Sequence, residues 1–126
     1  MPKKILLVDD ERDILEIYKS RISSWGYDAL IAENAEEAIK ILKETKIDTI
    51  ILDYLMPDMD GITLLKKIRE VDKKIPAIMF TAYSEETAIK DADKLDIAAF
   101  IPKTSPYTNT IDSLKKTLEI IFKKEK

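Results

Sequence analysis

Five short apolar runs, each followed by a stretch with helical periodicity, constrain the fold of this chain more than any other feature. In the third run, Ile50-Ile51-Leu52 leads directly into Asp53. An uninterrupted apolar run bounded by turn signals is typical of a strand that is buried on both faces. We therefore expect five strands, at residues 3–8, 27–31, 48–52, 77–80 and 97–101.

The stretches after these strands carry apolar residues at intervals of three and four, which indicates helices. Asp10, Asn34 and Ser84 are suited to cap the first, second and fourth helices. Gly26 suits the left-handed turn that ends the first helix. Strands and helices that alternate along one chain form a parallel sheet with helices on both faces.

The order of these elements defines the expected fold class and domain organisation. We expect an α/β fold with a doubly wound, five-stranded parallel sheet in the flavodoxin-like order 2-1-3-4-5. No linker or low-complexity tract divides the 126 residues. The sequence therefore predicts a single domain over residues 1–126, without an output domain.

The composition excludes several kinds of chemistry. The chain has no histidine and no cysteine, so serine–histidine catalysis, imidazole ligands and thiolate chemistry are ruled out. Its two glycines, Gly26 and Gly61, are too few for a glycine-rich phosphate loop. A net charge of -3 gives no electrostatic basis for nucleic-acid binding. No apolar run reaches membrane-spanning length, so we expect a cytoplasmic protein that does not bind membranes.

Polar side chains follow four of the expected strands. Asp9 and Asp10 follow the first strand, Asp53 the third and Thr81 the fourth, while Lys103 lies just after the fifth. In the expected order these four strands are consecutive neighbours. Open parallel sheets bind ligands beyond the carboxyl ends of their strands. We therefore expect these five residues to meet in one cleft.

The residue types in this cleft suit phosphoryl transfer. Crowded carboxylates are destabilising unless a cation joins them, and an all-oxygen ligand set suits Mg²⁺. Lys103 can place a positive charge on a phosphoryl group, and Thr81 can donate a hydrogen bond to one. Asp53 is the nucleophile candidate, because a carboxylate can accept a phosphoryl group as an acyl phosphate.

Each residue also has an ordinary structural explanation. Asp9 and Asp10 could cap the first helix, and Asp53 could begin a turn. Thr81 could be a common strand residue, and Lys103 a solvated loop lysine. These explanations together require a coincidence at four neighbouring strand ends, so the sequence favours a functional site.

Four motifs carry a resemblance to a known family. They are ILLVDDE at 5–11, IILDYLMPDMDG at 50–61, FTA at 80–82 and FIPK at 100–103. In this combination they are specific, and the chain resembles the receiver domain of two-component response regulators over essentially its whole length. The resemblance implies that Asp53 accepts a phosphoryl group from a phosphohistidine on a sensor histidine kinase or a histidine phosphotransfer protein.

The resemblance also implies a metal site. Asp10, Asp53 and the backbone carbonyl of Leu55 would ligate Mg²⁺, with Asp9 acting mostly through water. The implied activity is that of a phosphoacceptor signalling domain with Mg²⁺-dependent self-phosphorylation and autodephosphorylation, not that of a conventional enzyme.

The remaining implied roles concern the conformational switch. Lys103 would contact Asp53 or its phosphoryl group, Thr81 would move toward that group, and Phe100 would turn inward. The face that reports the state of the domain to a downstream target protein would include Ile89, Phe100, Tyr107 and Ile111. The kinase and this target are the expected partners.

The sequence departs from the family pattern near two of these residues. Lys103 is usually followed by proline, but here Pro102 precedes it and Thr104 follows it. Leu55 and Tyr83 are bulky at positions where polar side chains often place the hydrolytic water. We therefore expect a long-lived acyl phosphate.

Three alternatives remain open at this stage. A Mg²⁺-dependent aspartyl phosphatase would need a second aspartate two residues after the nucleophile, where this chain has Leu55. A degenerate receiver that acts only as a binding module would not need the complete set of acids. A flavin or nucleotide binder on the same fold would need the glycine-rich loop that the chain lacks.

Overall fold

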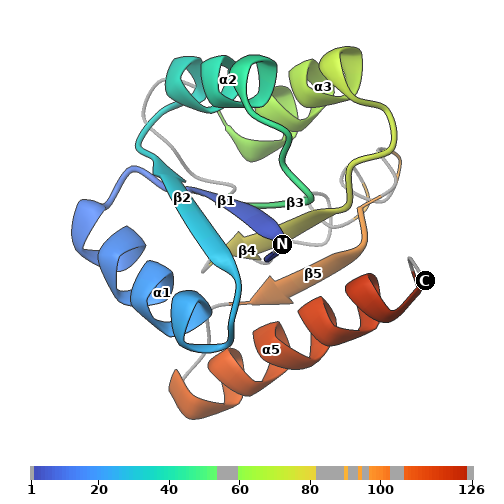
Figure 1. Ribbon diagram of the computed structural model, residues 1–126. Coiled ribbons are helices and arrows are strands. Elements are labelled where there is room, and N and C mark those ends of the chain that lie inside the picture. The colour runs from blue at the N-terminus through green and yellow to red at the C-terminus, as the bar shows by residue number, and fades with distance from the viewer. Residues whose placement is uncertain are drawn as a thin grey trace.

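The computed structural model describes residues 2–53, 60–81, 90, 94, 97–102 and 107–124 of the chain. Strands and helices alternate in this part (Figure 1). The elements are β1 (Lys4–Val8), α1 (Arg12–Ser24), β2 (Asp28–Ala32), α2 (Ala35–Glu44), β3 (Thr49–Leu52), α3 (Gly61–Val71), β4 (Ala77–Thr81), β5 (Ala99–Pro102) and α5 (Tyr107–Lys124). The expected fourth helix, with its cap at Ser84, falls outside the described residues. Among the described helices, none is long and apolar enough to cross a membrane.

The five strands form one parallel sheet in the order β2-β1-β3-β4-β5. Helices α2 and α3 cover one face of this sheet, and α1 and α5 cover the other (Figure 1). The predicted fold class and strand order are therefore confirmed. Both faces are covered, which explains why the strands are continuous apolar runs and do not alternate with polar residues.

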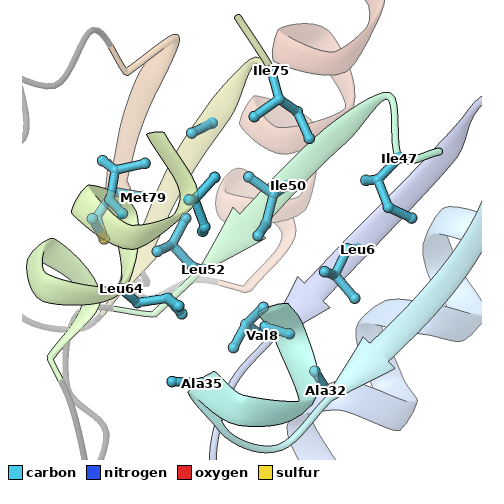
Figure 2. Packing of buried hydrophobic residues seen from close by; sticks show 14 of the residues in the cluster. Leu6, Val8, Ala32, Ala35, Ile47, Ile50, Leu52, Leu64, Ile75 and Met79 are labelled. Atoms are coloured by element: carbon cyan, nitrogen blue, oxygen red, sulfur yellow. The ribbon is translucent and has the colours of Figure 1, made fainter. Parts of the chain in front are cut away.

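Alternate residues of each strand belong to two separate cores. Leu6, Ile50 and Met79 pack with α2 and α3 in one apolar cluster, which Figure 2 shows from close by. Their strand neighbours Ile51 and Phe80 pack with α1 and α5 in the other cluster. This alternation follows from the two-residue period of a strand. It fixes which side chains face α1, the helix that begins beside the acidic residues.

The helix ends agree with the sequence at two positions and differ at one. Asn34 caps α2, because its Oδ1 accepts a hydrogen bond of 2.8 Å from Glu37 N. Gly26 adopts φ 95° after α1, as predicted. Asp10 does not cap α1: the helix begins at Arg12, and its N-cap residue is Glu11, which has no side-chain cap. The Glu11 N–H donates to Asp9 Oδ1 at 3.0 Å, a hydrogen bond that lies before the helix and does not cap its first turn.

The observed strands differ from the predicted ones by one or two residues at their ends. β2 begins at Asp28 because Asp28 is the first residue paired with β1, opposite Lys4. β5 begins at Ala99 for the same reason, opposite Ile78 of β4. It extends to Pro102, which is tolerated because β5 lies at one edge of the described sheet.

Asn34 should contribute measurably to stability. Replacing Asn34 with alanine leaves the Glu37 N–H without its cap, and we expect the free energy of unfolding to fall by about 1 kcal/mol. Urea denaturation measures this change, and Asn34→Asp is the control that keeps a capping oxygen. Equal stability of the alanine and aspartate variants would contradict the assigned cap.

Candidate active site

The pairing of β1 with β3 places Asp9 and Asp53 side by side. Val8 and Leu52, the last residues of the two strands, are partners in the register. The main-chain hydrogen bonding between the two strands continues past Leu52, since Asp53 N donates to Val8 O at 3.0 Å. Asp9 N donates to Ala32 O of β2 at 3.2 Å. Both aspartates are therefore held by the sheet, at the carboxyl ends of its central strands.

Asp9, Asp10 and Asp53 form one acidic cluster, as the sequence predicts. One carboxylate oxygen from each lies within 4.8 Å of the other two. The residues Asp9 and Asp53 are buried, with only 6% and 9% of their surface exposed, whereas Asp10 is exposed. Three like charges at this separation repel one another, and burial prevents water from screening them fully.

The pKa of Asp10 is raised, mainly by loss of hydration and to a smaller extent by this repulsion. Loss of hydration raises the pKa of its carboxyl group above the usual value, and the hydrogen bond and charge of Asp9 and the charge of Asp53 raise it further. A backbone hydrogen bond opposes these effects but does not cancel them. The ionised cluster is therefore a site where a cation is favoured. Its all-carboxylate donors fit a hard ion such as Mg²⁺.

An apolar floor lies under the two buried carboxylates. A cavity of about 10 Å³ is lined by Asp9 and Asp53 together with strand residues and the Ile14, Leu15 and Tyr18 side chains of α1. This volume accommodates at most about one water molecule. These side chains of α1 and the strands therefore leave little space next to the two buried carboxylates, on the side of the sheet that α1 covers.

Tyr18 and Phe80 form part of this floor and pack against each other. Their ring centroids are 4.8 Å apart with an interplanar angle of 89°, an edge-to-face arrangement. The spacing of apolar residues in the sequence gives no signal of this contact between Tyr18 and β4. The link between α1 and the end of β4 is therefore a feature that sequence reasoning missed.

Arg12 is a second feature that sequence reasoning missed. Its guanidinium group lies 3.6 Å from Glu16 Oε1 and 3.4 Å from Glu33 Oε1. The spacing of Arg12 and Glu16 is visible in the sequence, but the contact with the residue after β2 is not. All three side chains are well exposed, so these ion pairs contribute little to stability.

The other predicted site residues lie partly outside the described structure. The segment with Leu55 and the segment with Lys103 are both outside it. Thr81 is the last residue of β4, and its side chain is not described. Met79 of the same strand pairs with Leu52 of β3. The end of β4 therefore lies next to the strand that leads to Asp53.

The predicted switch and output residues have different environments. Phe100 is partly buried on β5 and packs against the cluster beneath α2 and α3. Ile111 is only 7% exposed and belongs to the core beneath α1 and α5. Its expected place on an output surface is therefore wrong, because its side chain packs against the sheet. Ile89 and the side chain of Tyr107 lie outside the described residues.

Comparison with known proteins agrees with this geometry. The family model for the response regulator receiver domain matches residues 5–118. Sporulation initiation phosphotransferase F of Bacillus subtilis is 32% identical over 120 residues, which cover 95% of this chain and 97% of that protein. The transcriptional regulatory protein PhoP of the same organism, which regulates alkaline phosphatase synthesis, is 41% identical over 86 residues. That match covers 68% of this chain but only 36% of PhoP.

A solved structure gives the same result at the level of the fold. The response regulator TrrA of Thermotoga maritima, in complex with Mg²⁺ and BeF, superimposes with a TM-score of 0.77. It is 32% identical, and the match covers 91% of this chain and 98% of that one. With the strand order, the acidic cluster and the matched residues in agreement, the chain belongs to the receiver domain family of two-component response regulators.

Proposed function

We propose that Asp53 accepts a phosphoryl group from a phosphohistidine on a sensor histidine kinase or a histidine phosphotransfer protein, in a reaction that needs Mg²⁺. The single observation that carries this proposal is the acidic cluster, in which carboxylate oxygens of Asp9, Asp10 and Asp53 lie within 4.8 Å of one another. Membership of the receiver family supports it. The Mg²⁺ and BeF bound to TrrA support the choice of ion.

Asp10 and Asp53 would hold Mg²⁺, with the Leu55 carbonyl as a further ligand and Asp9 acting through water. When bound, the ion neutralises charge on the carboxylates and on the phosphoryl oxygens. Asp53 directly follows β3, and its N–H donates a hydrogen bond to Val8 O. Because its main chain is already held in place, Asp53 loses little conformational entropy when it reacts.

The transfer is a displacement at phosphorus. A carboxylate oxygen of Asp53 forms the new O–P bond while the P–N bond of the donor phosphohistidine breaks. The donor imidazole nitrogen keeps the electron pair of that bond and leaves. The product is an acyl phosphate on Asp53, which carries added negative charge and new acceptor oxygens at the end of β3.

These acceptor oxygens would bias the conformation of the domain. The Thr81 hydroxyl would donate a hydrogen bond to one of them, and the Lys103 ammonium group would attract them. Because both interactions require the phosphoryl group, they stabilise one conformation over the other. The position of β4 beside β3 supports the role of Thr81. Phe100 would change its packing in response.

We infer that the signal leaves by docking to a downstream target protein or by onward transfer of the phosphoryl group. The name of the Bacillus subtilis relative, a phosphotransferase, supports onward transfer for that protein. We propose that the reaction takes place in the cytoplasm.

Asp53 is tested by intact-mass analysis after incubation with phosphoramidate and Mg²⁺. We expect the wild-type chain to gain one phosphoryl group, and Asp53→Asn to gain none, because an amide oxygen is a poor nucleophile. Asp28→Asn is the matched control, since Asp28 begins β2 at the opposite end of the sheet. A phosphoryl group that persists in Asp53→Asn would overturn the assignment of the acceptor.

Asp10 is tested by thermal unfolding with and without Mg²⁺. Neutralising Asp10 removes charge repulsion, so we expect Asp10→Asn to melt at a higher temperature than the wild type in the absence of divalent ions. The same variant should bind Mg²⁺ about tenfold to a hundredfold more weakly, because it loses a ligand. Asp13→Asn, in the first turn of α1, is the control with the same charge change and should show neither effect. Unchanged Mg²⁺ affinity in Asp10→Asn would exclude Asp10 as a ligand.

The lifetime of the acyl phosphate tests the roles of positions 55 and 83. We expect slow autodephosphorylation in the wild type, and an acceleration of about tenfold when Leu55 or Tyr83 is replaced by a polar residue that can orient water. The time course of phosphoryl loss measures this rate, with Leu55→Met as the apolar control. An equal rate in the polar and apolar variants would refute the explanation.

A further inference from the structure

Two buried aromatic rings connect α1 with the strand end next to the acidic cluster. Tyr18 lies in the middle of α1 and is 6% exposed, and Phe80 lies in β4 and is 3% exposed. Their edge-to-face contact is 4.8 Å between centroids, a geometry that attracts beyond the burial of area alone. The pair therefore forms a defined contact within the core beneath α1 and α5.

Phe80 is the residue immediately before Thr81 in the chain. The two residues share a peptide bond, so packing that restrains the main chain of Phe80 also restrains the main chain from which Thr81 extends. Phe80 also pairs with Ile101 of the edge strand β5. The packing of Phe80 thus influences the position of the β4 terminus relative to β3 and Asp53.

The cavity beneath the acidic cluster limits how far these rings can move. It has a volume of about 10 Å³ and is lined by Tyr18, Phe80, Asp9 and Asp53. Space for about one water molecule does not accommodate a displaced aromatic ring. Removing the Tyr18 ring would enlarge this space directly beside Phe80, and the end of β4 would gain freedom.

We propose that Tyr18 is a positioning residue for phosphoryl transfer: it packs against Phe80, holds the end of β4, and so sets the distance between the Thr81 hydroxyl and the phosphoryl group on Asp53. This inference rests on the function proposed above. It differs from a purely structural role of Tyr18, which would affect the stability of the fold but not the transfer rate at equal stability.

Ile22 provides the matched control for Tyr18. It lies one turn further along α1, belongs to the same core and is fully buried. It does not line the cavity beneath the acidic cluster. Ile22→Val and Ile22→Ala remove different amounts of apolar volume from the same helix, so they bracket the loss of thermal stability expected for Tyr18 variants.

The test compares the phosphorylation rate by phosphoramidate with the Mg²⁺ dissociation constant in the full chain. We expect Tyr18→Leu to be phosphorylated about tenfold more slowly than the Ile22 variant of equal melting temperature, because Thr81 is less often in place. Its Mg²⁺ dissociation constant should match that of the wild type, since the ligating carboxylates belong to β1 and β3. Tyr18→Phe, which keeps the ring, should retain the wild-type rate.

Two further measurements keep the inference falsifiable. If Tyr18→Leu does not fold, Tyr18→Met, whose flexible side chain adapts to irregular space, is compared in the same way. In a double-mutant cycle, Tyr18→Leu combined with Phe80→Leu should be no slower than the slower single variant, because both changes remove one contact.

The outcomes separate this inference from the proposed function. Equal rates for Tyr18 and Ile22 variants of equal stability, or additive losses in the cycle, would overturn the role of Tyr18 while leaving Asp53 as acceptor. Failure of the wild-type chain to take up any phosphoryl group would overturn the proposed function, and the role of Tyr18 with it.

Discussion

The parallel pairing of β1 with β3 holds two buried carboxylates side by side, and the site depends on this constraint. Asp9 and Asp53 both follow the last paired residues of their strands, so neither can move away without breaking the main-chain hydrogen bonds that they donate. Asp10 adds a third charge at the solvent side. The sheet thereby fixes a repulsion that the chain alone relieves only in part, and a divalent cation or a phosphoryl-bound state changes its energy strongly.

The two cores make this arrangement possible. The core beneath α2 and α3 and the core beneath α1 and α5 bury the sheet on both faces, which leaves the strand ends as the place where polar groups meet. On the α1 side, the floor of the cluster is apolar and nearly free of space. On this side the site is therefore close-packed, and a change at Asp53 is not readily absorbed by compression of the core.

The fold could be predicted because the pattern that indicates it extends along the whole chain. Alternating apolar runs and helical stretches allow few topologies, and the strand order then determines which residues meet. Thus Asp9, Asp10 and Asp53 could be grouped although Asp53 lies far along the chain from the other two. The cap of α1 was predicted wrongly because the helix begins at Arg12, so that Glu11 and not Asp10 occupies the N-cap position.

Features that depend on packing between distant side chains could not be predicted. The contact of Tyr18 with Phe80 depends on the position and rotation of α1 over the sheet, which hydrophobic spacing does not specify. The burial of Ile111 is a different case, because the spacing of apolar residues in the last helix predicts it and the structure confirms it. The resemblance to a family identified the residues at strand ends but not these contacts.

The central claim is that the carboxylate after β3 becomes an acyl phosphate. Borohydride reduces an acyl phosphate to a primary alcohol, and thus converts a phosphorylated aspartate into homoserine. The chain is incubated with phosphoramidate and Mg²⁺, reduced, digested and sequenced by mass spectrometry. The account predicts homoserine at position 53 only, and none when Mg²⁺ is removed. Homoserine at another aspartate, or phosphorylation that leaves position 53 unreduced, would contradict it.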